Sequence, residues 1–346
     1  MCRPALVRTV NAVKELCSKI FHPLMAKSIN VNIGDVGISI TGHSELTDWE
    51  IAPSYFPFIW EGEPDIQVTM RRGTPDGTAA RKFFGSYPIW DLYRSNGKSI
   101  IKFYDEMPGL ARALAFETHL KEADLFFPDA TDQFIDPFYG PVLELLMINY
   151  LAQFRGAVLH SCGIKSGESG LLFVGESGAG KSTLTRLWNQ AADVEILSDD
   201  RTIVRKKDGD YWMYGTPWHG EAKFGSPQSV KLDRIYFIQH GTANSVRTIK
   251  GAEPVQNLLT CSFPPYWDSE GMEFTIDLFS DLTATLPCYE LFVKPDIGVV
   301  EYIKAHGEEL EVLDDRVRIE NEISAQGAKL QPCSSAVKIS HAFNRT

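Results

Sequence analysis

The chain has 346 residues, of which 44% are hydrophobic and 23% are charged, and its formal net charge is −11 at pH 7. This composition is that of an ordinary globular protein, and the length suggests about two domains. A nucleic-acid-binding surface normally carries an excess of Lys and Arg, so the acidic balance argues against nucleic acid as a partner. It does not exclude a local pocket for a small anion.

The six cysteines are scattered, without a CxxC pair or a metal-ligand spacing. This pattern suits a reducing compartment, in which each thiol is a small core residue. Lys14 and Glu15 interrupt the N-terminal stretch MCRPALVRTVNAVKELCSKI, so it lacks the apolar core of a signal peptide. No run approaches about 18 apolar residues, so no membrane span is expected. These features predict a cytoplasmic protein.

The first part of the chain predicts a helix followed by strands. Residues 1–28 have apolar positions at helical spacing and predict an amphipathic lead-in, which packs on its own domain or faces a partner. In residues 29–136 the pattern changes to short alternating runs such as INVNIGDVGISITG, DIQVTMRRG and GKSIIKFYD. We therefore expect a β-rich N-terminal domain over 29–136, without residues that suggest chemistry.

The stretch PFYGPVLELLMINYLAQFRG, residues 137–156, predicts the best long helix. Pro141 suits an early helical position, and Gly156 suits the residue just past the end. Because its apolar residues run nearly all round, this helix should be buried. It would open a second domain over 137–315, followed by a loosely ordered tail over 316–346.

Within the second domain, predicted strands and helices alternate. The stretches AVLHSCGIK, GLLFVG, VEILS, LDRIYFIQHG and CYELFV predict strands, whereas KSTLTRLWNQA, AEPVQNLLTCS and GVVEYIKAHGEEL predict helices. RTIVRKKDGDYWMYGTP predicts a hairpin that turns at Asp208-Gly209. Alternation of this kind indicates an α/β layer architecture.

The segment GESGAGKS, from Gly175 to Ser182, fits the phosphate-binding pattern G-x-x-x-x-G-K-[ST], the P-loop. The glycines allow a tight turn that aims backbone N–H groups at a phosphate. LLFV before the segment predicts a buried strand, and the helix predicted after it adds its positive end. Lys181 would bridge the β- and γ-phosphates, and the Ser182 hydroxyl would ligate Mg²⁺. The residues expected to bind the nucleotide are Gly175, Glu176, Ser177, Gly178, Ala179, Gly180, Lys181, Ser182 and Thr183.

Two carboxylates follow the next apolar strand, VEILS, at Asp199 and Asp200. This position suits a Walker B acid, which holds Mg²⁺ directly or through water, and Asp199 is taken as the metal partner beside Ser182. The other carboxylate can accept a proton from an attacking hydroxyl. The sequence leaves open which aspartate takes which role, and an acidic pair can also simply turn the chain.

Three stretches together resemble a known family. AVLHSCGIKSGESGLLFVGESGAGKSTLTRLW places a histidine strand, a hairpin and the glycine loop in one unit, LSDDRTIV follows, and YGTPWHGE follows that. Over about residues 137–310 the chain resembles the C-terminal kinase domain of HPr kinase/phosphorylase, which shares a P-loop core with phosphoenolpyruvate carboxykinases. It is especially similar to the HPr-kinase-like proteins beside peptide-modification genes, including lasso-peptide maturation kinases. The resemblance implies a P-loop kinase core of this type.

The resemblance also implies roles for individual residues. Lys181, Asp199 and Asp200 match catalytic positions, and His160 matches a histidine that lies near the phosphate-acceptor site in the family. TPWHG, residues 216–220, matches a loop that the peptide-kinase-like members carry close to the active site. The second glycine-rich signature of true HPr kinases is not found here, so neither the HPr substrate nor phosphate removal is carried over.

These features predict an ATP- and Mg²⁺-dependent kinase whose acceptor is a serine-like hydroxyl on a peptide, protein or small molecule. Two alternatives stay open: a nucleotide-dependent binding or regulatory module with weak ATPase activity, and a small-molecule kinase or carboxykinase-like enzyme. ATP consumption without a phosphorylated product would favour the first, and the identity of the product would distinguish the second. By analogy with related kinases, a homo-oligomer is also considered.

Overall fold

The computed structural model describes residues 28–42, 46, 49–76, 81–86, 88–95, 97–104, 110–128 and 136–307. Residues 1–27 of the predicted lead-in helix and the predicted tail over 316–346 lie outside the described residues. The chain divides into two compact units, Met1–Pro295 and Asp296–Thr346. The first unit holds two large β-sheets, and in the second residues 298–307 are helical.

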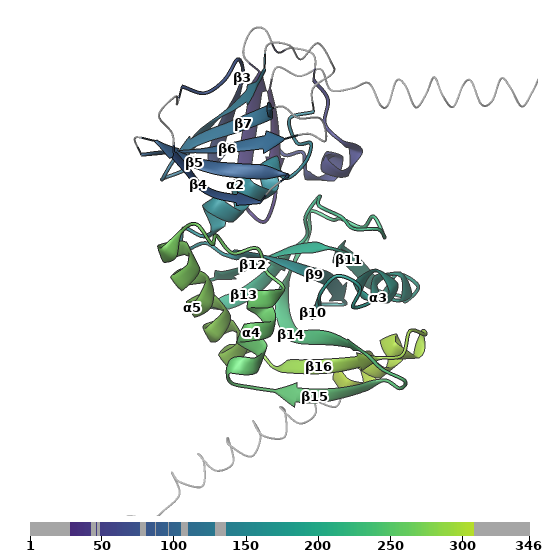
Figure 1. Cartoon of the computed structure of the whole chain (residues 1–346). Coiled ribbons are helices and arrows are strands. Elements are labelled where there is room, and N and C mark those ends of the chain that lie inside the picture. The colour runs from purple at the N-terminus through teal and green to yellow at the C-terminus, as the bar shows by residue number, and fades with distance from the viewer. Residues whose placement is uncertain are drawn as a thin grey trace, which may run out of the picture. The chain divides into compact units, whose positions relative to one another are not determined.

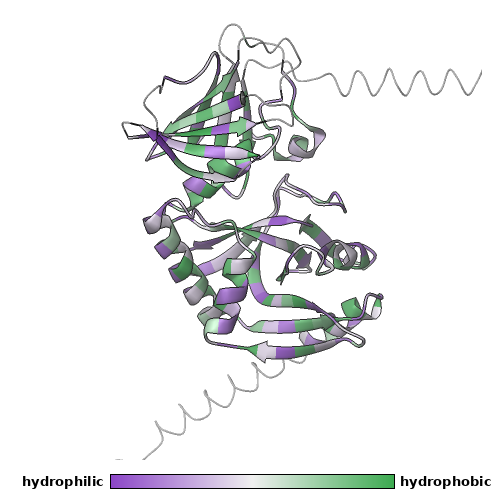
Figure 2. Ribbon diagram, viewed as in Figure 1, coloured by the Kyte–Doolittle hydropathy of each residue, from purple (hydrophilic) through white to green (hydrophobic). Residues whose placement is uncertain are grey.

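The first sheet has eight strands in the order β1-β2-β3-β8-β7-β6-β5-β4. Figure 1 labels β3 to β7 of this sheet. Their bounds are β1 Ser28–Asn32, β2 Gly37–Gly42, β3 Ile66–Arg72, β4 Arg81–Ser86, β5 Trp90–Ser95, β6 Lys98–Tyr104, β7 Leu110–Glu117 and β8 Glu122–Phe127. The 3-10 helix η1, Pro53–Phe58, lies between β2 and β3 in the chain. Strands are therefore present where the alternating runs predicted them, and Figure 2 shows hydrophobic residues spread along them.

Helix α2, Val142–Leu151, is buried nearly all round, as its composition predicts: eight of its ten residues are buried. It belongs to a hydrophobic cluster that also includes residues of the first sheet and Val158, Ile203 and Tyr214 of the second. The helix ends five residues before the predicted end near Gly156. Phe154 has φ 61, in the left-handed region, and the N–H groups of Arg155 and Gly156 both donate to Leu151 O at 2.9 and 3.0 Å.

The second sheet has the strand order β10-β9-β12-β13-β14-β16-β15, with β11 paired to β9. Its strands are β9 Ala157–Ser166, β10 Ser169–Val174, β11 Val194–Ser198, β12 Arg201–Lys207, β13 Asp210–Tyr214, β14 Ser229–His240, β15 Ser245–Ile249 and β16 Cys288–Val293. Since β10 also pairs in parallel with β14, the strands β10, β9, β12, β13 and β14 close a ring. The accompanying helices are α3 Lys181–Trp188, α4 Ala252–Thr260 and α5 Ser269–Thr285 (Figure 1).

The protein is thus a mixed α/β structure, but its second sheet is less parallel than an alternation of strands and helices suggests. Within the described residues, its parallel pairs are β10–β14 and β14–β16, and its other pairs are antiparallel. The hairpin β12–β13 turns at Asp208 and Gly209, as predicted, and both have positive φ, 54 and 89.

Strand β15 and helix α5 are not among the elements predicted above. The buried residues of α5 are Gly271, Thr275, Leu278, Phe279 and Leu282, whose spacing is that of one helical face. The sequence therefore carried a signal for α5. In the described part of the chain, the helices are too short or too polar to cross a bilayer.

Candidate functional site

The glycine loop, Gly175–Ser182, joins strand β10 to helix α3, which begins at Lys181. Gly180 precedes the helix with φ 100, a backbone conformation that glycine adopts without the strain of a side chain. A Cβ atom at Gly178 or Gly180 would have no heavy atom within 4 Å. The loop therefore faces open space at the N-terminal end of a helix, where an anion can be held by backbone N–H groups.

Lys181 is the buried cation of this loop, with an exposure of 6%. Its Nζ donates to the backbone oxygens of Gly175 at 2.7 Å and Glu176 at 3.0 Å. The ion pairs found among the described residues do not include Lys181. Burial lowers the pKa of this ammonium group, because carbonyl dipoles replace only part of its hydration. A phosphate in the loop would supply the missing negative charge, so these residues fit a nucleotide.

Helix α3 is fixed against the sheet by its buried face. Trp188 packs with its ring centroid 6.0 Å from that of Phe173 on β10. The Thr185 hydroxyl lies 2.9 Å from the Cys162 thiol of β9 and donates to Lys181 O at 2.8 Å. Ser182 is half-buried in the first turn of this fixed helix.

The aspartate pair lies between β11 and β12, which pair in turn with the same strand, β9. Ser198 is opposite Gly163 and Arg201 is opposite His160, so Asp199 and Asp200 pass alongside β9 between these two points. The register shifts between Ile196 and Ser198, which marks a β-bulge just before the pair. Bulges of this kind redirect the side chains that follow them.

Asp199 is buried, with an exposure of 1%, and both of its carboxylate oxygens accept backbone hydrogen bonds. Oδ1 accepts from the N–H of Gly220 at 2.9 Å and of Phe224 at 3.3 Å, and Oδ2 accepts from the N–H of Ala222 at 2.8 Å. All three donors belong to residues 216–224, hereafter the Asp199 loop. A Cβ at Gly220 would lie 3.0 Å from Asp199 Oδ2 and 3.1 Å from Asp200 Cβ, so the loop packs closely on both aspartates.

Asp200 faces a different set of partners. Its Oδ1 lies 3.0 Å from His160 Nε2, and its Oδ2 accepts a hydrogen bond from the Arg201 guanidinium. Arg201 also donates to Glu144 of α2, and its guanidinium lies 4.5 Å from the centroid of the Phe263 ring. Glu144, Arg201, Asp200 and His160 therefore form one chain of polar contacts from α2 to β9.

His160 is neutral at pH 7 in this environment. Burial, assisted by the positive charges of Lys181 and Arg201, lowers the pKa of His160 to about 4. A neutral imidazole that faces a carboxylate donates its Nε2–H, so His160 can orient Asp200 without taking up its proton. The glycine loop and the aspartate pair also meet at one end of β9, because Val174, just before the loop, is opposite Ser161, and the neighbouring His160 contacts Asp200.

The site includes residues that the sequence reasoning did not identify. Arg201 and Glu144 hold Asp200 from one side, and Glu144 had a signal, because it is the one charged residue within the apolar sequence of α2. His240 Nε2 lies 3.1 Å from Gly178 O, since β14 runs parallel to β10 and ends beside the glycine loop. His219 is exposed, and its Nδ1 lies 3.2 Å from Gly220 O.

Among the described residues, no cluster of three or more His, Cys, Asp or Glu side chains could hold a metal ion. Mg²⁺ usually takes one or two protein ligands and completes its shell with phosphate oxygens and water. The Ser182 hydroxyl fits such a role, whereas both carboxylate oxygens of Asp199 are occupied by backbone N–H groups.

The three described cysteines, Cys162, Cys261 and Cys288, are buried free thiols.

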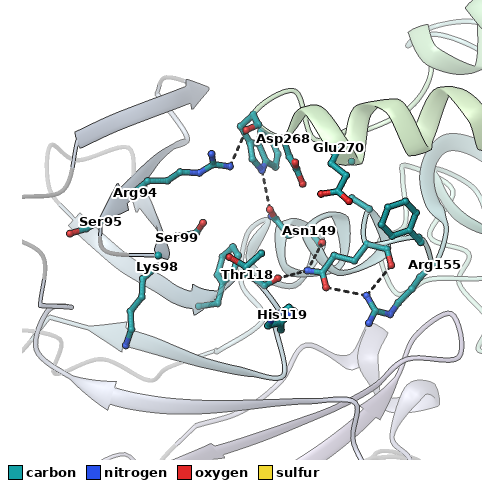
Figure 3. A pocket seen from close by; sticks show the side chains of 17 residues that line it. Arg94, Ser95, Lys98, Ser99, Thr118, His119, Asn149, Arg155, Asp268 and Glu270 are labelled. Atoms are coloured by element: carbon teal, nitrogen blue, oxygen red, sulfur yellow. Dashed lines mark hydrogen bonds between the residues drawn. The ribbon is translucent and has the colours of Figure 1, made fainter.

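A cavity of about 740 Å³ lies elsewhere, among β5, β6, the C-terminal end of α2 and the start of α5 (Figure 3). Its polar groups bond to one another: Gln153 donates to Thr118 O at 2.7 Å, and Arg155 donates to Gln153 Oε1 at 3.2 Å (Figure 3). None of its lining residues belongs to the glycine loop, the aspartate pair or the Asp199 loop. The glycine loop and the aspartate pair are therefore separate from this cavity.

Comparison with known proteins adds little to this geometry. No family model and no curated protein matches the chain. Among solved structures, the chain is similar to the HPr(Ser) kinase/phosphatase from Coxiella burnetii at 12% sequence identity. The match covers 50% of this chain and 99% of that one, with a TM-score of 0.26. A likeness of this degree identifies neither an activity nor a substrate, so function has to be argued from the side chains.

Proposed function

We propose that this protein is an ATP- and Mg²⁺-dependent phosphotransferase that moves the γ-phosphoryl group to a hydroxyl of a peptide, protein or small molecule. One observation carries the proposal. A buried ammonium group in an open glycine loop, at the start of a helix, lies in the same region as a carboxylate that a neutral histidine and an arginine orient. The first feature fits a nucleotide phosphate, and the second fits the activation of a hydroxyl.

The glycine loop would bind the phosphates through its backbone N–H groups and the N-terminal end of α3. Lys181, now bonded to two carbonyl oxygens of its own loop, would turn its Nζ to the β- and γ-phosphates. Its positive charge would balance the charge that develops during transfer. The Ser182 hydroxyl would be a protein ligand of Mg²⁺, which when bound would neutralise phosphate oxygens. Asp199, the metal partner expected from the sequence, has both carboxylate oxygens occupied by backbone N–H groups and would act on the ion only through its negative charge.

Asp200 is the better candidate for the base. Three backbone N–H groups already occupy the carboxylate of Asp199, whose exposure is 1%, whereas the side chain of Asp200 is 25% exposed. In the proposed step, the acceptor oxygen forms a bond to the γ-phosphorus while the bond from phosphorus to the β-γ bridging oxygen breaks. ADP leaves, and the hydroxyl proton passes to Asp200. His160 and Arg201 would hold this carboxylate in a fixed orientation.

A label-transfer experiment tests the proposal. The protein and its Lys181→Ala variant are incubated with Mg²⁺, γ-labelled ATP and a cell extract, and the label is located by mass spectrometry. Label on a peptide, protein or metabolite only with the unaltered protein supports the phosphotransferase and names the acceptor. Label that appears solely as inorganic phosphate contradicts it and favours a nucleotide-dependent binding module.

A further inference from the structure

The Asp199 loop is attached to the rest of the protein on two sides. On one side, its backbone N–H groups donate to Asp199. On the other side, the indole N–H of Trp218 donates to the hydroxyl oxygen of Tyr55 at 3.1 Å. Tyr55 lies in η1, 163 residues earlier in the chain. The bond therefore joins the loop to a segment far from it in sequence.

Tyr55 is a fixed anchor. Its side chain is buried, and its ring centroid lies 4.4 Å from that of Phe138. Its backbone N–H donates to Ala52 O at 3.0 Å. Burial raises the pKa of the Tyr55 hydroxyl, which therefore stays uncharged and accepts the indole N–H at any physiological pH. A buried aromatic residue with one polar atom in use has little freedom to move.

The ends of the loop are fixed, because the Gly215 N–H donates to Gln228 O at 3.1 Å, the Ser226 N–H donates to Leu197 O at 2.9 Å, and Gly225 forms an isolated β-bridge with Ser198. Residues 215–228, between β13 and β14, contain no helix or strand. The Thr216 hydroxyl donates to Arg201 O at 2.6 Å, and the partly buried ring of Trp218 packs against the first hydrophobic cluster. Between these fixed ends, residues 217–224 have no regular structure, and such segments open locally at a low free-energy cost. One well-placed hydrogen bond therefore changes how often they open.

We propose that Tyr55 and Trp218 are positioning residues, whose hydrogen bond keeps the Asp199 loop closed on Asp199 and thereby holds Asp200 in its productive orientation. The role of Asp200 in this inference rests on the proposed function. The link is physical: Gly220 packs against both aspartates, and Asp199 and Asp200 share one stretch of backbone. Opening of the loop would leave Asp199 buried without its three donors and displace its neighbour.

Hydrogen exchange tests whether the Tyr55–Trp218 hydrogen bond keeps the Asp199 loop closed, and it requires no activity assay. Tyr55→Phe and Trp218→Phe each remove one partner of the bond and keep an aromatic ring. We expect the amides of Gly220, Ala222 and Phe224 to exchange about 3–10-fold faster in both variants, as the loss of one hydrogen bond allows. The double variant should exchange no faster than Trp218→Phe, because both changes delete the same bond.

The matched control is Trp267→Phe, which removes a similar bond from Trp267 Nε1 to Asn149 Oδ1 at 2.9 Å, outside the Asp199 loop. The exchange of the three loop amides should not change in this control. Unchanged exchange in both Tyr55→Phe and Trp218→Phe, in proteins that are folded, overturns the inference.

Kinetics test whether the same bond positions Asp200. Both variants should lower kcat for phosphoryl transfer by about 3–10-fold, because a loosened Asp199 loop lets Asp200 shift from its productive position. The dissociation constant for MgATP should stay the same, and Tm should fall by less than about 3 °C. Faster exchange with an unchanged kcat overturns the positioning role. Unaltered protein that transfers no phosphate contradicts the proposed function instead, and the exchange data then still decide whether the bond holds the loop.

Discussion

The carboxylates of Asp199 and Asp200 have different environments, although the two residues are neighbours in the chain. Asp199 is buried and accepts three backbone N–H groups, whereas Asp200 contacts the side chains of His160 and Arg201. The β-bulge before the pair and the close approach of Gly220 account for this difference. One aspartate therefore holds a loop, and the other is available for chemistry.

Asparagine substitutions should separate these two roles. Asp199→Asn places an amide where backbone donors need an acceptor and should destabilise the protein by about 2–3 kcal/mol. Asp200→Asn keeps the shape of a half-exposed side chain, so stability should change by less than about 1 kcal/mol. The transfer activity of folded Asp200→Asn should nevertheless be lost, while MgATP still binds. Chemical denaturation and calorimetric titration measure these effects, and full activity of Asp200→Asn would contradict its role as the base.

Lys181→Ala should abolish phosphoryl transfer and weaken nucleotide binding. The substitution removes the buried cation of the glycine loop, and the loss of such a charge lowers turnover on the order of 10²–10³-fold. Lys250→Ala, which removes an exposed cation that follows β15, is the control and should change neither property. Equal affinities of the two variants for MgATP, measured by calorimetry, would argue against a phosphate at this loop.

Gly220→Ala should disturb the aspartate pair through its methyl group. The added Cβ would lie 3.0 Å from Asp199 Oδ2 and 3.1 Å from Asp200 Cβ, so the loop must move outward. We expect a loss of about 1–3 kcal/mol of stability together with a reduced kcat. Glu221→Ala alters the exposed neighbour and should leave both unchanged. If Gly220→Ala has the same stability and the same kcat as Glu221→Ala, the loop can accommodate the added methyl group and this prediction is wrong.

His160 predicts a specific pH dependence of stability. Its pKa is about 4 in the folded protein, against about 6.5 in an unfolded chain. The unfolded state therefore binds more protons than the folded state between these values, and stability should fall as pH drops from about 6.5 to about 4. The contribution is on the order of 1–3 kcal/mol and should be missing in His160→Gln. Urea unfolding of both proteins at pH 7 and pH 4.5 measures it. An equal loss of unfolding free energy between pH 7 and pH 4.5 in the unaltered protein and in His160→Gln would contradict this prediction.

Local features of the site could be predicted from the sequence, whereas its long-range contacts could not. The strand–loop–helix around Lys181 follows from a contiguous pattern of apolar residues and glycines. The division between Asp199 and Asp200 depends on residues 216–224, which reach the pair only after the hairpin β12–β13 has reversed the chain. The predicted end of α2 was wrong because Phe154 adopts a left-handed backbone conformation. Phenylalanine rarely adopts this conformation, so nothing in the sequence indicated it at this position.

The ring of strands in the second sheet has a consequence for the order of events during synthesis. The glycine loop follows β10, but β10 pairs with β14, so Leu172 lies beside Ile235, more than sixty residues later in translation. A ribosome-bound chain that ends before β14 lacks this partner and also lacks His240 beside Gly178. Pairing over such a separation forms slowly and late. We expect that a nascent chain completes the surroundings of the glycine loop only after His240 has left the exit tunnel. A nucleotide bound there, as proposed, could then not guide the earlier steps of folding.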